Sequence, residues 1–437
     1  MHRPSPIARC STSLLPLPPM KTCVSSFLQP SVLSTSRLMN SVKILRQNGG
    51  IPASLPGEDH ISGMLFYLST LPTATSGVTD GFTATERIRP ISTIERAEEL
   101  GITPTHASWE IRLLHYQLSE VFRTNPGILL HLAVYPKSAG GNYTFAEVKT
   151  LQRYASGRLR QVGIWLGDKA ADASLVTTLQ GIADTLDSEE MPLSVLLAPK
   201  VTAPVASLPT NLAGGGKSRV SLLIAQDGEG VAKTLYTDAS NNSAKASVSA
   251  LGTFLGILSR AAVHHSIGWV QQYPLGLSLP AFGDGTLLRA LDKAVVDTLD
   301  KARYIFAVTY PALGDCYASD SHTLDEVTSD YNAIERVRTM DKAVRGVRKN
   351  LTPELGGAVY IDKETGKLQD YTIKHLEGVA SRALEEMERA GELSGYRAYI
   401  SPEQNVLASS SIEVVIREVP TGVLRSLRVK IGFTPKL

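Results

Sequence analysis

One segment of the chain has the residue types of a phosphate-binding loop, Gly214-Gly215-Gly216-Lys217-Ser218. Such a loop needs a preceding strand, a glycine where Asn211 stands, and a following helix whose N-terminus meets the phosphate. Here a proline-rich stretch precedes the segment and a strand pattern follows it. The sequence therefore predicts a linker at 214–218 and no nucleotide site.

A carboxylate pair beside a histidine, Glu58-Asp59-His60, has the residue types of an acid–base site. Adjacent residues in a loop rarely converge on one atom, and no nucleophile motif such as Gly-x-Ser-x-Gly accompanies them. The pair His264-His265 makes a poor bidentate site for the same reason, and His115 and His131 lie on apolar elements. We interpret all of these as turn, boundary or core residues.

Charged residues also follow several predicted strands, where parallel sheets bind their ligands. This pattern leaves open an alternative function, an α/β nucleotide-binding or hydrolytic enzyme that uses the strand ends. No Gly-x-Gly-x-x-Gly fingerprint follows any strand, and a fold alone does not argue a function. We therefore predict no enzyme, no catalytic residue, no cofactor and no metal. The strand-end candidates are Lys137, Asp168, Lys200 and Asp227.

The composition narrows the possible partners. The chain has 437 residues, 43% hydrophobic and 20% charged, which suffices for a sizeable core and two or three domains. A net charge of +2 disfavours nucleic acid or an anionic membrane as the main partner. The three cysteines form no disulfide framework and no zinc motif. No apolar run is long enough to span a bilayer, and 243–263 is predicted to be a buried core helix.

The first 38 residues differ from the rest of the chain. They are rich in Ser, Pro, Thr and Leu, and they show no periodicity. Met39 is followed at once by a strand pattern at 41–46. We therefore predict that 1–38 is a disordered leader and that Met39 is the true start.

From Thr105 to about 265 the pattern alternates amphipathic helices with continuously apolar strands. Such strands indicate a parallel sheet covered by helices on both faces, so we predict a three-layer α/β domain over 105–265. A short capped helix at 91–100 and an apolar patch at 61–68 precede it. The predicted helices are 105–123, 145–153 and 173–187, and the strands are 128–134, 162–166, 193–197 and 220–225.

The last third of the chain returns to a mixed pattern of helices and strands. It ends on alternating residues, in which Leu427, Val429, Ile431 and Phe433 share one face and Ser426, Arg428, Lys430 and Gly432 the other. That period of two predicts a terminal strand over about 425–434. Ahead of it we predict helices 287–300, 327–351 and 371–390, and strands 304–309, 358–361, 396–400 and 412–419, with a further strand or two in 267–279.

The predicted helix 327–351 carries the strongest charge feature. Residues three or four apart share a helix face, so Arg338, Lys342, Arg345 and Lys349 form a basic stripe opposite the apolar one. The stripe is either a solvated surface or the contact for an acidic partner.

Several segments of this C-terminal third resemble the core of contractile tail sheath proteins, in particular those of Mu-like phages and prophages of Bacteroidetes-type hosts. They are Arg336 to Leu355, Gly391 to Tyr396, Ile400-Ser401-Pro402 and Val419 to Val423. Residues 39–67 and 115–123 resemble the N-terminal part of the same group, so the resemblance covers about 39–437.

The resemblance implies an α/β and α+β fold in three parts. These are an N-terminal arm with the first part of the sheath core (39–104), the α/β middle domain (105–265), and a C-terminal core with a mixed sheet, flanking helices and a terminal strand arm (266–437). Its function would be that of a subunit in a phage virion tail or similar contractile particle. Hexameric rings would stack into a helical sleeve around a tail tube, with baseplate and terminator proteins as further partners.

The resemblance also implies roles for particular residues. Strand exchange between subunits would use Val42, Ile44, Leu427, Val429, Ile431 and Phe433. Contact with the inner tube would use the basic stripe or the next helix, that is Arg338, Lys342, Arg345, Lys349, Lys374, Arg382 and Arg389. Assembly would take place in the host bacterial cytoplasm, and contraction would drive the tube through a cell envelope for genome ejection. A non-contractile tail or scaffold component is the second alternative.

Overall fold

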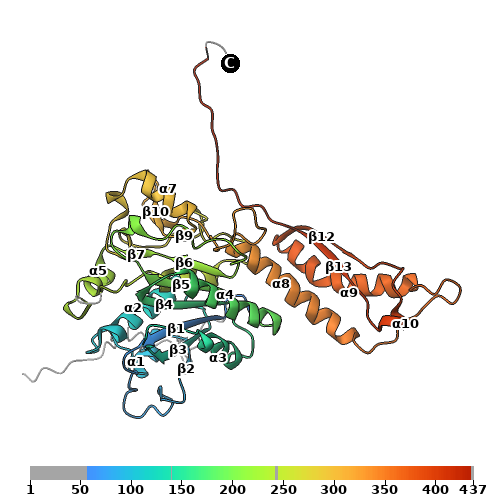
Figure 1. Ribbon diagram of the computed structural model, residues 1–437, viewed down its shortest axis with the longest axis horizontal. Helices are drawn as coiled ribbons and strands as arrows, with labels where there is room; N and C mark the ends of the chain where they lie inside the picture. Colours follow the sequence, from blue (N-terminus) through green and yellow to red (C-terminus); the bar gives the residue numbers. More distant parts are fainter. Residues whose placement is uncertain (1–56, 139, 242–244, 435–437) are drawn as a thin grey trace, which may run out of the picture. The chain divides into compact units, whose positions relative to one another are not determined.

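A computed structural model describes residues 57–138, 140–241 and 245–434 (Figure 1). The predicted leader, the start at Met39 and the strand 41–46 with Val42 and Ile44 lie outside the described residues. Within the described parts, the fold is mixed α/β with helices flanking a mixed sheet, as the sequence predicts.

The main sheet has seven strands, and all neighbours are parallel except the edge strand β2, which runs antiparallel to β3. Parallel strands need crossover connections, and the helices between them provide these. The order across the sheet is β2 (Ile88–Ile91), β3 (Leu130–Pro136), β1 (Ser62–Leu68), β4 (Gln161–Ala170), β5 (Ser194–Lys200), β6 (Val220–Leu223) and β9 (Tyr304–Ile305).

Strand β1 lies in the middle of this sheet and is buried along its whole length. Met64 and Phe66 point into the core on one face, while Leu65 and Tyr67 point into the core on the other. The sequence shows this segment only as an apolar patch, because a continuous apolar run does not distinguish a strand from a buried helix.

Helices cover both faces, which confirms the three-layer prediction. On one face Gly252 lets α6 approach α2, since a Cβ there would lie 2.0 Å from the Gln117 carbonyl oxygen. That face carries α1 (Ile94–Glu99), α2 (Trp109–Thr124), α5 (Gly230–Thr237) and α6 (Leu251–Arg260). The other carries α3 (Ala146–Tyr154), α4 (Ala173–Ser188) and α7 (Lys293–Lys301).

The predicted domain boundaries near 105 and 265 fall inside this sheet. Strands β1 and β2 come from the first predicted segment, β3 to β6 from the second, and β9 from the third. The strand predicted at 304–309 divides at Phe306, because β9 joins the main sheet while β10 (Ala307–Thr309) pairs with β11 (Cys316–Ala318). The segment 267–279 forms no strand, and β8 (Pro280–Phe282) pairs with β7 (Ala225–Asp227).

The C-terminal part consists of two long helices, one short helix and a two-stranded antiparallel sheet, which we call the C-terminal module (Figure 1). Helix α8 begins at Ile334 and not at 327, because the Asn332 side chain donates to the Val327 carbonyl at 2.6 Å and holds a loop there. The elements of the C-terminal module are α8 (Ile334–Leu351), α9 (Asp370–Arg389), β12 (Leu393–Tyr399), α10 (Val406–Ser409) and β13 (Val415–Pro420).

Three further sequence predictions differ from the structure. The strand predicted at 358–361 is reduced to one bridge between Ile361 and Leu368. Helix α7 is shorter than predicted, with a separate single turn before it. Residues 421–434 form neither helix nor strand. Single 3-10 turns occur at Val205–Ser207, Ala239–Asn241, Leu288–Ala290 and Thr352–Glu354.

Candidate assembly surface

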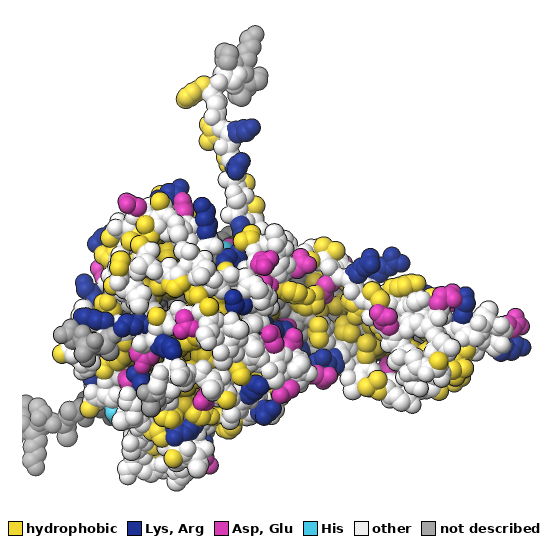
Figure 2. All heavy atoms as spheres, in the orientation of Figure 1, with side chains coloured by type: hydrophobic (Ala, Val, Ile, Leu, Met, Phe, Trp, Pro, Cys, Tyr) yellow, Lys and Arg dark blue, Asp and Glu magenta, His cyan; other side chains and the backbone are white. Residues whose placement is uncertain are grey.

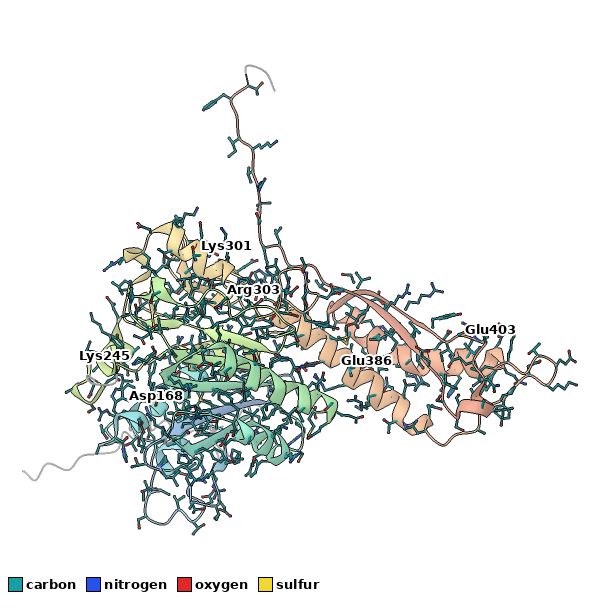
Figure 3. The ribbon with its side chains drawn as sticks, in the orientation of Figure 1. Asp168, Lys245, Lys301, Arg303, Glu386 and Glu403 are labelled. Atoms are coloured by element: carbon teal, nitrogen blue, oxygen red, sulfur yellow. The ribbon has the colours of Figure 1, made fainter. Side chains whose placement is uncertain are left out.

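Three of the four charged candidates at the strand ends bind one another or the backbone. Lys137 Nζ lies 2.7 Å from Glu110 Oε1 and 2.6 Å from Asp168 Oδ2, which Figure 3 labels. Burial lowers the pKa of Lys137, but the two carboxylates outweigh it and leave the pKa raised. This lysine therefore stays charged and paired, which is the arrangement of a structural contact.

The other two strand-end candidates are Asp227 and Lys200. Asp227 accepts the backbone N–H groups of Glu229, Ser278 and Leu279 at 3.0–3.1 Å, and so holds two loops together. Lys200 ends β5 in register with Ala170. Asp227 is thus engaged in loop contacts, while Lys137 and Asp168 are engaged with each other.

The glycine-rich segment 214–218 is a linker, as predicted. Gly214, Gly215 and Gly216 all have positive φ angles, which glycine adopts without strain. Lys217 Nζ donates to the carbonyl of Leu212 at 3.1 Å, within its own loop. Strand β6 follows, so no helix N-terminus is available for a phosphate.

Two further kinds of site are missing from the part of the chain that the structure describes. No group of three or more His, Cys, Asp or Glu side chains is placed to hold a metal ion. No described helix combines the length and the apolar character needed to cross a bilayer.

The predicted basic stripe is the largest correction. Arg338 is only 3% exposed and donates to the Ala261 carbonyl at 3.1 Å. Lys342 Nζ lies 3.1 Å from Asp59 Oδ2, and Arg345 Nη2 lies 2.8 Å from Asp59 Oδ1. Arg338 is thus buried, while Lys342 and Arg345 are partly exposed and paired with Asp59, which lies far away along the sequence.

Asp59 is therefore a structural anchor and not part of an acid–base site. Burial raises the pKa of Asp59, but Lys342 and Arg345 outweigh burial and leave the pKa below its usual value. The neighbouring Glu58 pairs with Arg160. The turn interpretation of Glu58-Asp59-His60 holds, with a charged contact added that the sequence does not reveal.

Part of the apolar face of α8 is uncovered. Val344 is 40% exposed, and it borders a groove of about 300 Å³ between α8, α9 and β13. The groove also contains one oxygen of Glu418 that is buried without a hydrogen-bond partner. Burying a polar atom without a hydrogen-bond partner costs free energy. The groove therefore differs from a fully packed core and resembles a binding surface. Its apolar lining is Met340, Ala343, Val344, Val347, Leu384 and Ile416.

The remaining predicted tube contacts lie on the surface. Lys349 is exposed near the end of α8, and Arg382 is exposed on α9. Lys374 pairs with Glu377 at 2.7 Å, and Arg389 pairs with Glu385. These pairs are local to α9, so all four cations stay accessible.

The two-stranded sheet of the C-terminal module has open edges. β12 and β13 pair from Leu393 with Pro420 to Tyr399 with Val415, and no other described strand extends the sheet. Helix α9 packs against β12. An unpaired strand edge is a template for another chain unless something blocks it.

The residues after β13 have the opposite character, and we call 421–434 the C-terminal arm. Leu427 is 76% exposed and Val429 68%, while Ile431 and Phe433 are fully exposed. The arm has no acidic residue, and Figure 2 shows its apolar and basic side chains. The strand predicted here has no partner strand within the described chain.

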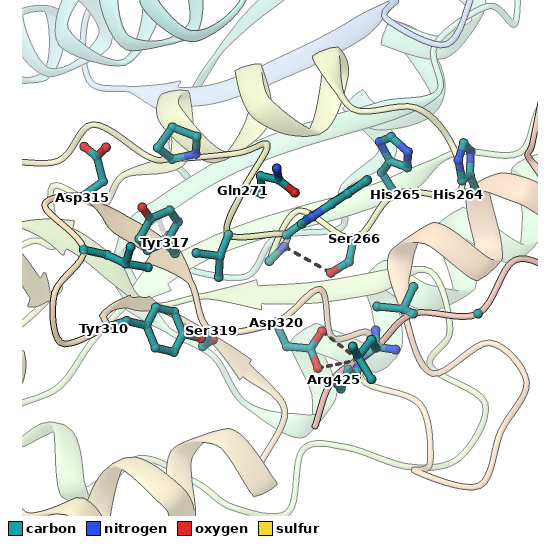
Figure 4. A pocket seen from close by; sticks show the side chains of 18 of the residues that line it. His264, His265, Ser266, Gln271, Tyr310, Asp315, Tyr317, Ser319, Asp320 and Arg425 are labelled. Carbon is teal, nitrogen blue, oxygen red and sulfur yellow. Dashed lines mark hydrogen bonds and ion pairs between the residues drawn. The ribbon is translucent and has the colours of Figure 1, made fainter. Parts of the chain in front are cut away.

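The root of the arm is tied down by Arg425 (Figure 4). Its Nε lies 2.8 Å from Asp320 Oδ2, and its Nη2 lies 2.6 Å from Glu335 Oε1 in the first turn of α8. Burial raises the pKa of Asp320, but the contact with Arg425 outweighs it and leaves the pKa lowered. A hollow of about 1090 Å³ lies beside this contact, lined among others by His265, Trp269 and Tyr310.

Sequence reasoning missed Arg425, although the chain holds a signal for it. In an extended chain Arg425 falls on the same face as Leu427 and Val429. A charge on an otherwise apolar face needs a partner of its own, and here the partners are Asp320 and Glu335. Their distance along the sequence hides the pairing.

Comparison with solved structures places the fold among sheath proteins. The helical sheath of the anti-feeding prophage, solved in its contracted state, aligns with a TM-score of 0.56 at 13% identity, covering 92% of this chain and 100% of that one. A sheath tail protein of Desulfitobacterium hafniense aligns with a TM-score of 0.47 at 10% identity, covering 87% and 100%. The first likeness confirms the predicted sheath fold.

The chain belongs to the DUF2586 family. The family's N-terminal domain, described as "DUF2586, N-terminal domain", matches residues 41–322, and "DUF2586, C-terminal domain" matches residues 330–437. No curated protein matches the chain. The C-terminal match includes α8, the two-stranded sheet and the arm.

Proposed function

We propose that this protein is the structural subunit of a contractile tail sheath, and that it is not an enzyme. The observation that carries the proposal is that one chain has both an exposed apolar arm and a sheet with unpaired edges. The C-terminal arm is extended, apolar and exposed, while the β12–β13 sheet has open edges beside an apolar groove. Each feature supplies what the other lacks.

In this proposal the arm of one subunit adds a strand to the β12–β13 sheet of a neighbour. Main-chain hydrogen bonds give such an addition its strength, and alternate side chains in pockets give it specificity. Leu427, Val429, Ile431 and Phe433 share one face and enter the groove beside Ile416 and Val344. Burying an apolar side chain of this size contributes about 1.5–3 kcal/mol, so four of them make a strong link.

The contact is heterologous, because the arm and the sheet edge are different surfaces. Heterologous contacts that do not close into a ring build open helical polymers. Stacked hexameric rings around a tail tube are the form we propose, with Val42 and Ile44 adding a second exchanged strand. Tube contact would use Lys349, Lys374, Arg382 and Arg389, and baseplate and terminator proteins would bind the ends of the sleeve.

Contraction in this proposal is a change between two packings of rigid subunits that stay linked by their arms. Bistable interfaces of this kind store free energy without a nucleotide. Release of that energy would drive the tube through a cell envelope. The particle tail is the site of function, and the host cytoplasm is the site of assembly.

Electron microscopy of the purified protein tests the proposal. The full chain should form hollow sleeves of one diameter in negative stain. A variant that lacks residues 425–437 should remain a folded monomer and form no sleeves, although the loss of Arg425 beside Asp320 and Glu335 should lower its melting temperature. Normal sleeves from the truncated protein would overturn the assigned role of the arm.

A further inference from the structure

The two ends of the described chain are both fixed to helix α8 by ion pairs. The C-terminal arm is held at its root by Arg425, which contacts Glu335 in the first turn of the helix. At the other end, Asp59 lies two residues after the first described residue and contacts Lys342 and Arg345. One helix thus carries both attachment points.

The contacts at the C-terminal root are more than a surface ion pair. Glu335 is 3% exposed, and it also accepts the hydroxyl of Ser321. Arg425 reaches both oxygens of Asp320, at 2.8 and 3.1 Å, and Glu335 at 2.6 Å. Such a guanidinium contact with two carboxylates fixes direction as well as position. The residues that follow Arg425 are exposed.

The contacts at the N-terminal root have the same design with the charges reversed. One carboxylate, Asp59, lies between two cations of α8. Lys342 is itself held at 2.5 Å by Glu392, next to the start of β12. Arg338 reaches the Asp59 carbonyl at 3.4 Å from the same helix. The first described turn of the chain is therefore tied to α8 and, through Lys342, to the residue before β12.

The helix sets the distance between the two roots. Glu335 precedes Lys342 by two turns and Arg345 by nearly three, which corresponds to roughly 10–15 Å along the axis at 1.5 Å per residue. A helix that packs against α9 does not change this spacing easily. The two roots are therefore held at a constant separation.

We infer that α8 is a shared anchor for the two arms, with Arg425 and Asp59 as positioning residues that fix where each arm leaves the subunit. This inference rests on the proposed function, because it concerns arms that link neighbours. Its consequence is that the geometry of the sleeve depends on α8 as well as on the exchanged strands. Without an anchor, the exchanged strands could still pair, but the direction in which the arm leaves the subunit would no longer be fixed.

The test uses neutral variants of the full-length protein. Arg425→Gln and Asp59→Asn remove one anchor each, and Arg425→Lys keeps the charge without the planar fork. Arg428→Gln is the matched control on the same arm, and Asp297→Asn, on an exposed residue of α7, is the matched control for Asp59→Asn. Negative-stain images give sleeve diameter and helical order, and hydrogen exchange of the unassembled protein gives protection at residues 57–61 and 421–425.

We expect the two neutral anchor variants to form polymers of irregular diameter without sharp layer lines. Amide exchange should rise about tenfold in the segment next to the lost anchor. Both controls should form regular sleeves, and Arg425→Lys should recover part of the order. Melting temperatures separate a misplaced arm from an unfolded subunit, because an anchor variant that melts like a control cannot owe its irregular polymers to unfolding.

Regular sleeves from Arg425→Gln and Asp59→Asn, with unchanged exchange, would overturn the inference and leave the proposed function intact. Absence of sleeves from the wild-type protein and both controls would instead overturn the proposed function. An anchor variant with disordered sleeves but unchanged exchange at its root would also contradict the inference, since the anchor would then act elsewhere.

Discussion

The seven-stranded sheet and the C-terminal module solve the problem of burying apolar surface in different ways. In the sheet, β1 is buried on both faces and hydrogen-bonded on both edges. In the module, β13 is largely exposed, and the buried clusters consist of only a few residues each, such as Ala343, Leu384, Met387 and Leu393. The sheet is complete within one chain, whereas the module leaves strand edges and an apolar groove uncovered.

This difference leads us to expect separate roles for the two regions in folding and in assembly. In the sheet, buried side chains on both faces give a large cooperative core. In the module, open edges and an open groove leave free energy to be gained on assembly. Substitutions in the sheet should therefore change folding, and substitutions in the arm should change assembly.

The sharpest test of the comparison uses two phenylalanines. Phe66 is fully buried and stacks on Trp165 with ring centroids 5.5 Å apart. Phe66→Ala should lower the free energy of unfolding by about 3–5 kcal/mol, measured by denaturant titration. Phe433→Ala should change it by less than about 0.5 kcal/mol and still weaken sleeve formation. A similar loss of stability in both variants would break the comparison.

The next test concerns the joint between the two regions. Asp341 of α8 makes two hydrogen bonds to Arg219, at 2.9 and 3.0 Å, just before β6. Asp341→Asn removes one of the two carboxylates paired with a nearly buried guanidinium, the other being Asp187 at 3.1 Å, and should cost about 2 kcal/mol. Calorimetry should then show the module and the sheet unfolding in two steps. One unshifted transition would show that other contacts make the joint.

The third test uses pH. Burial, together with the charges of His265, Lys342 and Arg338, lowers the pKa of His264 to about 4. The unfolded chain binds this proton near pH 6.5, so the contribution of a neutral His264 is complete above that pH and is lost as the pH falls toward 4. Stability should drop between pH 7 and pH 5, and His264→Gln should reduce that drop. An equal drop in the variant would assign the effect to other groups.

The smallest expected effect is a change in melting temperature from replacing either of two helical glycines that have open space around them. A Cβ at Gly181 of α4, or at Gly378 of α9, would meet nothing within 4 Å. Alanine in a helix interior is favoured over glycine by about 0.5–1 kcal/mol. If sheet and module unfold together, Gly181→Ala and Gly378→Ala should raise the melting temperature equally. A gain from Gly181→Ala alone would show that the module unfolds separately.

The sequence predicts the sheet well because its signals are local. Continuous apolar runs at 162–166 and 193–197 lie between helices with clear stripes, and the structure has β4, α4 and β5 there. Prediction from the sequence fails where the contact partner of a side chain lies far away along the chain. The sequence predicts a surface stripe for Arg338, Lys342 and Arg345. Their contact partners, Asp59 and Ala261, are distant in sequence.

The arm illustrates the same limit from the other side. Alternation at 427–433 predicts a strand, but a strand needs a partner edge, and the described chain offers none to these residues. Periodicity reports which residues share a face and is silent about which chain covers that face.

The open edge of the two-stranded sheet has a consequence for size control. A subunit that offers an arm at one surface and an acceptor edge at another leaves both kinds of surface available at the ends of any chain of subunits. Nothing in such a link counts how many subunits have joined. If neighbours exchange arms as proposed, the length of the finished sleeve must be set by something outside the subunit, such as the length of the structure that it surrounds.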